Sequence, residues 1–286
     1  MIQDKKILLF LHYKIDLEII YKKKIYIIEL FKMGNSLMNL CKCCGEVLNL
    51  NDKHLRKEEF KRLFHHLKTN KKINTLLLDN TTLDDKGMEH LSNYLKDNTS
   101  VKKLTLSGNN ICFKGAHFLM KALSMNSGLE ILELKNNSFS PGKFLAEAIK
   151  MNQTLTSLNL SSNNLGNEGM KVLSTFIAKN KELRELFLSD NKIEKDGIVY
   201  LVESLKKNNC LQTLDLSKNG LAIEEAKYLS KLLKKKNSCK IQVLHLEENE
   251  FGNEGLKYLC NSIQVNTSLK EIYFSSNKIG KEKKIE

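Results

Sequence analysis

The chain has 286 residues, of which 41% are hydrophobic, and a net charge of +13 from 46 basic and 33 acidic side chains. A chain of this size and apolar content can bury a substantial core. Its seven cysteines lack the spacing of a disulfide framework, and no secretory signal stands out. We therefore expect a reducing, cytoplasmic compartment and not an extracellular one.

Residues 1–44 form a predicted N-terminal extension whose composition differs from that of the remaining chain. Residues 1–32 hold eight isoleucines and seven lysines, with no Gly, Pro, Ser, Thr or Asn. Their apolar run at residues 7–11 is far shorter than the roughly 20 residues that span a membrane. Two interpretations stay open for this stretch: an incorrectly assigned start codon, or an amphipathic helix that caps the first repeat.

Residues 33–44, with the sequence MGNSLMNLCKCC, resemble an N-myristoylation signal followed by palmitoylated cysteines, provided that the chain starts at Met33. Two acyl chains anchor a protein stably where one binds only marginally. This interpretation places the protein peripherally on the cytoplasmic face of a membrane. Met38 departs from the pattern, which has Ser or Thr there, and Gly34 is internal in the chain as given. The predicted modification sites are Gly34, Cys41, Cys43 and Cys44.

Other interpretations of this segment are an unmodified linker and cysteines that pack under the first repeat. A zinc site formed by its three cysteines with His54 is disfavoured, because Cys-x-Cys-Cys is not the usual paired spacing of zinc ligands. We expect no metal and no cofactor.

From residue 45 to residue 286 the chain repeats one pattern with a period of 28 residues. Most copies read L-x-x-L-x-L-x-x-N-x-L, followed by Gly and then by Leu, Leu and Asn at helical spacing; the third copy is two residues shorter and the sixth two residues longer. The apolar period thus changes from alternating to helical, which predicts one short strand and one helix in each copy. The clear or partial copies begin at Ile73, Val101, Leu129, Leu155, Leu183, Leu211, Ile241 and Leu269, after a degenerate copy at Gly45.

A single copy cannot bury its own apolar face, so neighbouring copies must cover it. Leucines of the strand and of the helix, such as Leu119 and Leu123, are expected to point into this shared core. A repeat of this length therefore predicts a solenoid, and solenoids commonly present a long surface to a partner. Four cysteines at repeat positions are expected to pack as small hydrophobic residues: Cys112, Cys210, Cys239 and Cys260.

Two asparagine positions and one glycine position recur within the copies. The ninth-position Asn, for example Asn109 or Asn219, has an amide that both donates and accepts hydrogen bonds. We expect it to satisfy backbone groups in the bend that follows each strand. The Asn three residues before most copies, for example Asn126, is predicted to end its helix in a left-handed conformation. The Gly, for example Gly197, is predicted to let the helix approach the strand layer.

These motifs resemble the ribonuclease-inhibitor class of leucine-rich repeats. The same class forms the repeat domains of NOD-like innate immune receptors and of the Ran GTPase-activating protein. The resemblance covers roughly residues 45–286. It implies a curved α/β horseshoe, with a parallel sheet on the concave side and helices on the convex side, but it implies no particular activity.

The strand residues that point away from the helices are predicted to form an acidic concave face. The second, third, fifth, seventh and eighth positions of all copies hold eleven acids and six bases, a net charge of −5. The positive charge must then lie on helices, loops and the N-terminus. It forms either a merely solvated lysine-rich surface or a surface that faces anionic lipid or nucleic acid. The acids are Glu46, Asp52, Asp79, Glu130, Glu133, Glu185, Asp190, Asp215, Glu247, Glu248 and Glu271.

The fifth position of the copies is a candidate column of partner contacts. Phe187 and Tyr273 are expected to be exposed there beside carboxylates, as anchors within a polar rim. We predict a protein partner with a basic surface. The predicted partner-binding residues are Glu130, Glu133, Asn159, Glu185, Phe187, Asp190, Asp215, His245, Glu247 and Tyr273.

The favoured function is a non-catalytic interaction scaffold. The chain has no phosphate-binding loop, and its seven histidines form no nucleophile or metal pattern, so we expect no catalysis and no small-molecule substrate. Resemblance to the Ran activator makes GTPase activation the alternative, although residues 281–284 are basic where that activator has an acidic tail. Specific nucleic-acid binding is not expected, because the lysines lack stacking aromatic partners.

Overall fold

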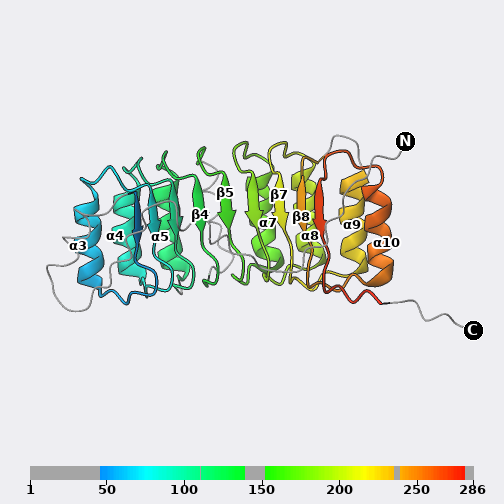
Figure 1. Cartoon of the computed structure of the whole chain (residues 1–286), viewed down its shortest axis with the longest axis horizontal. Helices are drawn as coiled ribbons and strands as arrows, with labels where there is room; N and C mark the ends of the chain where they lie inside the picture. Colours follow the sequence, from blue (N-terminus) through cyan, green and yellow to red (C-terminus); the bar gives the residue numbers. More distant parts are fainter. Residues whose placement is uncertain (1–45, 110, 139–151, 235–238, 281–286) are drawn as a thin grey trace, which may run out of the picture. The chain divides into compact units, whose positions relative to one another are not determined.

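The computed structural model describes residues 46–109, 111–138, 152–234 and 239–280 (Figure 1). The N-terminal extension and its predicted acylation sites lie outside the described residues. The chain divides into two compact units. We call residues 46–158 the N-terminal unit and residues 159–280 the C-terminal unit, and we describe each by itself.

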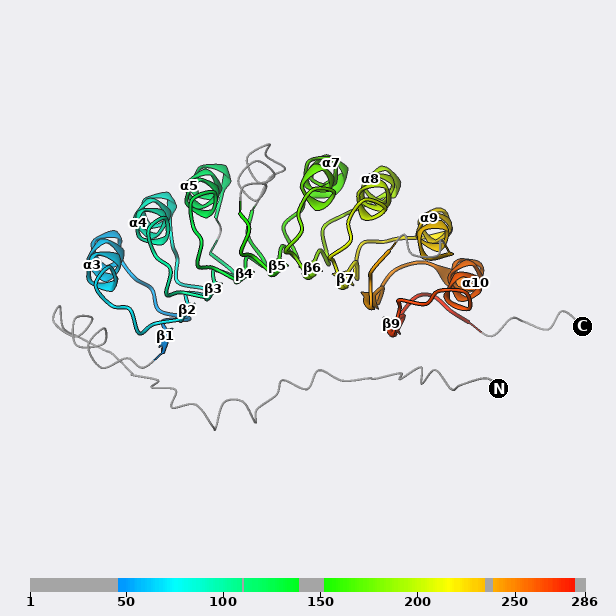
Figure 2. The same cartoon turned by 90° about the horizontal axis from the view of Figure 1, so that it is seen from above.

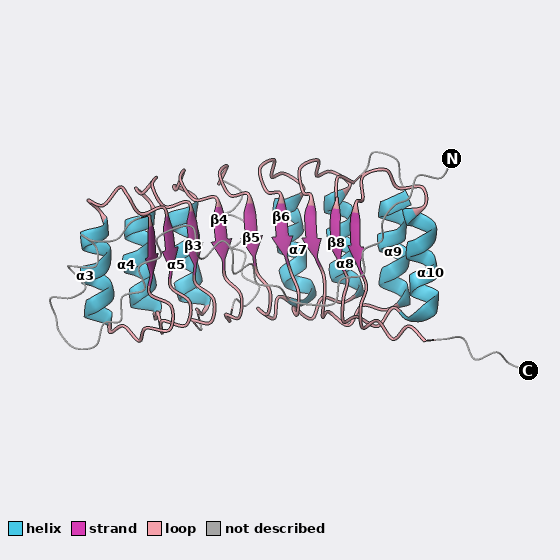
Figure 3. Cartoon of the chain, viewed as in Figure 1, coloured by secondary structure: helices cyan, strands magenta, loops and turns pink. Residues whose placement is uncertain are grey.

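The N-terminal unit alternates short strands with helices (Figure 3). Its parallel strands pair in register, so that Leu48, Leu76, Leu104 and Leu132 lie side by side. The helix expected in the third copy falls on residues 139–151, outside the described residues. The elements are β1 (Val47–Asn49), α3 (Lys57–Leu67), β2 (Thr75–Leu77), α4 (Asp85–Leu95), β3 (Lys103–Thr105), α5 (Phe113–Leu123), β4 (Ile131–Glu133) and, at its end, β5 (Ser157–Asn159).

The C-terminal unit repeats the same alternation. Parallel pairing aligns Leu186, Leu214, Leu244 and Ile272 across its strands. The elements are α7 (Gly166–Ile177), β6 (Glu185–Phe187), α8 (Lys195–Leu205), β7 (Thr213–Asp215), α9 (Ile223–Lys234), β8 (Val243–His245), α10 (Gly252–Ile263) and β9 (Glu271–Tyr273).

Within each unit the helices lie along one face of the sheet (Figure 2). The central residue of nearly every strand points toward them and is buried, as Leu104 and Leu214 are, while its two neighbours point the other way. We call this other side, which no described helix covers, the open face. The predicted α/β leucine-rich-repeat solenoid, with a parallel sheet and helices alternating with its strands, is confirmed.

The ninth-position asparagines behave as predicted. The buried Asn219 donates from Nδ2 to the carbonyl oxygens of Leu188 (3.0 Å) and Leu216 (3.1 Å). Its Oδ1 accepts from the backbone nitrogens of Asn191 (3.0 Å) and Ile193 (3.1 Å) in the preceding repeat. Each such amide therefore satisfies backbone groups of two repeats, which would otherwise be buried without partners.

The asparagines that lie three residues before most copies, which we call the second asparagine ladder, do not end their helices in the predicted left-handed conformation. No left-handed conformation occurs at these asparagines. Instead, Asn126 Nδ2 donates to the oxygen of Leu95 (2.6 Å), the last residue of α4, and Asn208 Nδ2 donates to Ile177 (2.7 Å), the last residue of α7. Each side chain thus caps the helix of the preceding repeat, because stacking places that carbonyl within its reach and leaves its own helix to end in the ordinary conformation.

The glycine near the start of each helix allows neighbouring segments to approach that helix closely, but the segments nearest to Gly197 are not strands. A Cβ on Gly197 would lie 2.8 Å from Asn167 Oδ1 and 2.8 Å from Ile193 Cγ2. These atoms belong to the neighbouring repeat's helix and to the segment before α8. The absent side chain therefore serves helix-to-helix stacking more than helix-to-strand packing.

The cysteines divide into two groups. Cys210 and Cys239 are buried, as expected of packing residues, whereas Cys112 and Cys260 are exposed. The prediction that all four pack in the core was therefore wrong for the latter two. Cys112 directly precedes α5, and Cys260 lies on α10 beside the buried Leu259, so in α10 it is the neighbouring leucine that faces the strands.

Candidate functional site

A polar strip runs across the open face of the C-terminal unit. It consists of the third, fifth and seventh positions of the last four repeats. It holds four carboxylates and neither lysine nor arginine. We call it the acidic strip; its members are Glu185, Phe187, Ser189, Thr213, Asp215, Ser217, Val243, His245, Glu247, Glu271, Tyr273 and Ser275.

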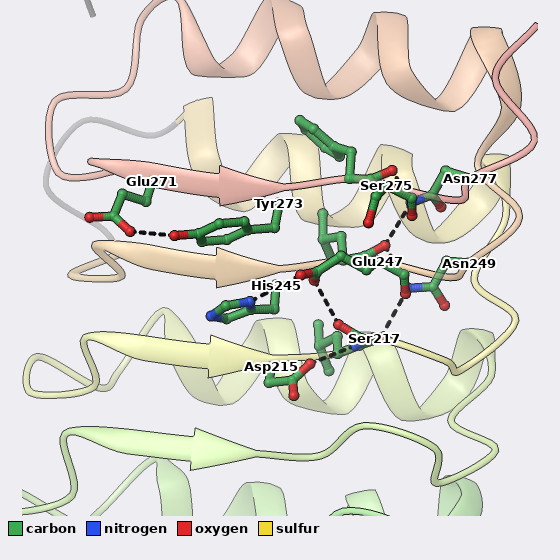
Figure 4. A network of polar contacts seen from close by, with 12 residues as sticks. Asp215, Ser217, His245, Glu247, Asn249, Glu271, Tyr273, Ser275 and Asn277 are labelled. Atoms are coloured by element: carbon green, nitrogen blue, oxygen red, sulfur yellow. Dashed lines mark hydrogen bonds and ion pairs between the residues drawn. The ribbon is translucent and has the colours of Figure 1, made fainter. Parts of the chain in front are cut away.

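The strand register forms the centre of the acidic strip. Phe187 pairs with Asp215, Asp215 with His245, and His245 with Tyr273 on successive parallel strands. Fifth-position side chains of neighbouring repeats must therefore lie side by side. The rings of His245 and Tyr273 stack with centroids 4.5 Å apart and 3° between their planes (Figure 4).

Hydrogen bonds hold three of the four carboxylates of the strip in place, those of Asp215, Glu247 and Glu271 (Figure 4). Glu247 accepts from the hydroxyl of Ser217 at 2.8 Å and contacts His245 Nδ1 at 3.3 Å. Asp215 Oδ1 accepts from the backbone nitrogen of Ser217 at 2.8 Å. At the far strand, the Tyr273 hydroxyl donates to Glu271 Oε2 at 2.7 Å. The carboxylates are thus oriented before any partner arrives.

The strip perturbs its own titratable groups. Burial of the His245 ring lowers its pKa, but the hydrogen bond and charge of Glu247 and the charges of Asp215 and Glu271 outweigh burial and raise the pKa above 6.5. Burial raises the pKa of Glu247, but hydrogen bonds from His245, its own backbone and Ser217 leave that pKa below 4.5. The hydrogen bond to Glu271 raises the pKa of Tyr273.

Basic side chains flank the strip at its edges. Lys218, at the eighth position, is paired with Glu248 at 3.1 Å. Arg184 and Lys270, at the second position, directly precede β6 and β9. The open face of this unit therefore has a negative centre with a basic margin at the second position, whereas the eighth position also carries Asp190 and Glu248.

Six of the ten predicted contact residues lie within the strip, and four do not. Glu130 and Glu133 belong to the N-terminal unit, where Glu130 pairs with Lys102 at 3.2 Å. Asn159 lies one repeat before the strip and accepts from the nitrogen of Ser161 at 2.9 Å. Asp190 is exposed in the turn after β6. The six residues that the structure brings together are Glu185, Phe187, Asp215, His245, Glu247 and Tyr273.

Two details of the strip differ from our expectations. Phe187 and Tyr273 are half-buried and not exposed, and for Tyr273 the cause is its stacking on His245 and its bond to Glu271. Sequence reasoning also missed Ser217, which joins Asp215 to Glu247. The signal was present, because Ser recurs at the seventh position of four repeats in this unit, at Ser161, Ser189, Ser217 and Ser275.

In the described ranges no three His, Cys, Asp or Glu side chains are grouped so as to hold a metal ion. None of the helices among those residues is long and apolar enough to cross a bilayer. The strip's chemistry is that of recognition: fixed carboxylates, hydroxyls and aromatic rings.

Comparison with known proteins agrees with the repeat pattern. A family model described as Leucine Rich repeat matches residues 152–174, 179–202, 207–222, 237–260 and 265–282. A solved structure, the C-terminal domain of tropomodulin from Caenorhabditis elegans, is similar at 16% sequence identity and a TM-score of 0.38, over 60% of this chain and 91% of that domain. A likeness of this size indicates nothing about function. No curated protein matches the chain.

The matched segments begin three or four residues before the repeats that start at Leu155, Leu183, Leu211, Ile241 and Leu269. Each of those repeats contributes a parallel strand and an asparagine of the ladder. Sequence matches and structure therefore agree on the boundaries of the repeating unit, and the fold of the chain is an α/β leucine-rich-repeat solenoid.

Proposed function

We propose that this chain is a non-catalytic interaction scaffold whose acidic strip binds a basic segment of a protein partner. The observation that carries the proposal is the strip itself, with four carboxylates and no lysine or arginine in a chain of net charge +13. Such segregation favours a positively charged partner and accelerates its encounter. The leucine-rich-repeat fold supports a binding role, since stacked repeats offer an extended surface.

The strip has the dimensions of a short peptide. Neighbouring strands lie about 4.8 Å apart, so the three gaps from Glu185 on β6 to Glu271 on β9 span roughly 14 Å. An extended chain advances about 3.3 Å for each residue, and a segment of about four or five residues therefore crosses all four strands. Lysine or arginine side chains in it would meet carboxylates on β6, β7 and β9, and Glu247 just after β8.

The aromatic rings add a second source of affinity. Tyr273 and His245 form a stacked pair whose flanks are carboxylates, and Phe187 lies on the opposite side of Asp215. A cation over the face of a tyrosine or phenylalanine ring is stabilised by about 0.5–1 kcal/mol at exposed sites. Arginine, which pairs with carboxylates bidentately and stacks on rings, fits this arrangement better than lysine.

The test is binding of a fluorescent five-residue Arg/Lys peptide, flanked by Gly and Ser, to the full chain. The double variant Glu185→Gln/Asp215→Asn removes two charges, while the new amide at position 215 retains an oxygen for the nitrogen of Ser217. We expect at least a tenfold loss of affinity by fluorescence anisotropy. The matched control, Glu203→Gln/Glu224→Gln, removes two exposed helix charges and should change affinity less than twofold. Equal loss in both variants would refute the strip as the binding surface.

The membrane-tethered form of this function also remains a proposal. It requires residues 1–44 to be a separate segment, translation to begin at Met33, and acylation of Gly34 with Cys41, Cys43 or Cys44. Mass spectrometry of the native N-terminus tests it directly, since an unmodified peptide beginning at Met1 rules it out.

Membership of the ribonuclease-inhibitor class and the alternative function, activation of a GTPase, likewise stay predictions. A hydrolysis assay with Ran-type GTPases tests the latter.

A further inference from the structure

A cleft of about 500 Å³ lies at the amino-terminal ends of the strands in the C-terminal unit. Four of its lining residues occupy the same repeat position, directly before β6, β7, β8 and β9: Arg184, Gln212, Gln242 and Lys270. Lys240, from the loop before β8, adds a further cation. In Figure 4 the strands run from left to right, so the cleft belongs to the end at which they begin.

The lining of the cleft is cationic. It includes Arg184, Lys240 and Lys270 but no carboxylate. Two lysines at the other ends of these strands form ion pairs with acids, Lys218 with Glu248 and Lys278 with Glu250. Within the described part of the chain, neither Lys240 nor Lys270 forms an ion pair. Three positive charges thus share one concave site without a counter-charge on its wall.

Arg184 is held in place before a ligand binds. Its Nη1 donates to the carbonyl oxygens of Lys181 (3.1 Å) and Cys210 (3.3 Å), and the side chain is half-buried. Its Nε and Nη2 make no hydrogen bond to another described residue, so both remain available to a ligand. A guanidinium fixed in this way binds a tetrahedral oxyanion through its planar fork with little loss of entropy.

Main-chain hydrogen bonds fix the spacing of the four residues that directly precede β6, β7, β8 and β9. The Arg184 oxygen accepts from the nitrogen of Gln212 (2.8 Å), the Gln212 oxygen from Gln242 (2.7 Å), and the Gln242 oxygen from Lys270 (2.7 Å). The amide groups of the two glutamines supply neutral donors between the cations. A site with an arginine fork, two lysines and amide donors has the chemistry of phosphate recognition.

We propose that this cleft binds a phosphate group. Its volume falls within the range of about 300–1,000 Å³ that is common for small-ligand sites and exceeds what a single phosphate needs. It therefore accommodates either a phosphorylated side chain on a bound peptide or a free polyphosphate such as pyrophosphate. Both sources present the same doubly charged oxyanion to Arg184, Lys240 and Lys270.

The cleft adjoins the acidic strip. Glu185 and Glu271 directly follow Arg184 and Lys270, and the Glu271 carboxylate is bonded along the strip to the Tyr273 hydroxyl. A basic segment on the strip could therefore place a phosphoserine at its end into the cleft. This extension rests on the proposed function, whereas binding of a free polyphosphate does not.

Calorimetric titration of the full chain with pyrophosphate at 150 mM salt tests the proposal. The variant Lys240→Gln/Lys270→Gln changes two exposed side chains and should weaken binding at least tenfold. The control Lys206→Gln/Lys227→Gln removes the same charge from the helix side and should change it less than twofold. Arg184 is left in place because it also holds the loop carbonyls. Equal weakening in both variants, or no binding by the unmodified chain at millimolar pyrophosphate, overturns the proposal.

A second arm identifies the source of the phosphate. The basic peptide is compared with and without a phosphoserine at one end. A gain in affinity that the Lys240→Gln/Lys270→Gln variant loses indicates a phosphorylated partner. No gain, together with intact pyrophosphate binding, indicates a free polyphosphate. The strip variant Glu185→Gln/Asp215→Asn should retain pyrophosphate binding, so failure of the strip and failure of the cleft are distinguishable.

Discussion

At the residue scale, the two recurring asparagines of each repeat show which hydrogen bonds can be predicted from the sequence and which cannot. The ninth-position Asn was predictable, because a buried amide beside a bend has few roles other than to pair with backbone groups. The partners of the other ladder were not predictable. The partner of Asn208 is the carbonyl of Ile177, one repeat earlier, and only stacking brings it within reach. The half-burial of Tyr273 was unpredictable for the same reason, because its ring stacks on His245 of the preceding strand, β8.

Loss of one ladder amide should be costly. Asn219→Ala leaves the carbonyl of Leu188 and two backbone nitrogens without partners inside the core, while the Leu216 carbonyl keeps its bond from Asn249 Nδ2. We expect the free energy of unfolding to fall by about 2–4 kcal/mol, since each unsatisfied buried group costs about 1–3 kcal/mol. Chemical denaturation measures it. Asn261→Ala, at an exposed position of α10, should cost less than about 0.5 kcal/mol; similar losses in the two variants would contradict the ladder's role.

The His245–Glu247 contact should give stability a defined pH dependence. The folded pKa of His245 is raised, so its contribution is complete below its ordinary value of 6.5 and is lost as pH rises through the folded pKa. The folded pKa of Glu247 is lowered, so its contribution is present above 4.5 and is lost as pH falls through the folded pKa. The pair therefore stabilises most between these limits, by up to about 1 kcal/mol.

Thermal unfolding of the unmodified chain and of His245→Gln across this range measures the effect. The difference between the two proteins should be largest near pH 5.5 and should shrink above pH 7. A difference that stays constant from pH 5 to pH 8 would show that the imidazolium does not contribute.

At the element scale, the change of apolar period determined where strands and helices form. Every described strand and helix lies where the pattern predicted it, because a strand buried on its helix-facing side alternates and a covering helix does not. The pattern did not predict which side chains of neighbouring repeats contact one another. The glycine near each helix start was assigned to strand packing, but the atoms nearest to Gly197 belong to the helix of the preceding repeat and to the segment before its own helix.

Close stacking of α7 and α8 should depend on that glycine. In Gly197→Ala the new Cβ would lie 2.8 Å from both Asn167 Oδ1 and Ile193 Cγ2. Asn167 Oδ1 also accepts from the nitrogen of Gly197 at 2.9 Å, so it cannot move without losing that bond. We expect a net destabilisation of about 1–2 kcal/mol after the gain in helix propensity. Gly280→Ala, whose new Cβ would have no neighbouring atom within 4 Å, is the control and should be neutral in the same unfolding experiment.

At the scale of the whole molecule, the segregation of charge is the feature on which the proposed function rests. A net charge of +13 alone points toward anionic partners, whereas the strip points toward a cationic one. Reading the repeat positions from the sequence grouped Glu185, Asp215, Glu247 and Glu271, which lie in the strip, with Glu130, Glu133 and Asp190, which do not. It did not reveal which carboxylates are oriented by hydrogen bonds, nor the cationic cleft beside them, because both depend on side chains from separate repeats meeting in space.

This charge arrangement predicts a strong salt dependence. Association of a basic peptide with the strip should slow several-fold between 50 and 300 mM salt, because the Debye length shortens from about 14 to 6 Å. Stopped-flow fluorescence measures the rate. In Glu185→Gln/Asp215→Asn the dependence should be distinctly weaker, and an unchanged slope would place the attraction elsewhere on the molecule.

The most direct test of the central claim is to locate the bound peptide. A basic pentapeptide that carries a photoreactive benzophenone is irradiated in complex with the full chain, and the cross-linked residues are identified by mass spectrometry. The account predicts adducts on the open face of β6–β9, at or beside Phe187, Val243 and Tyr273, and their suppression by excess unlabelled peptide. Adducts confined to the helices or to the N-terminal unit would contradict it.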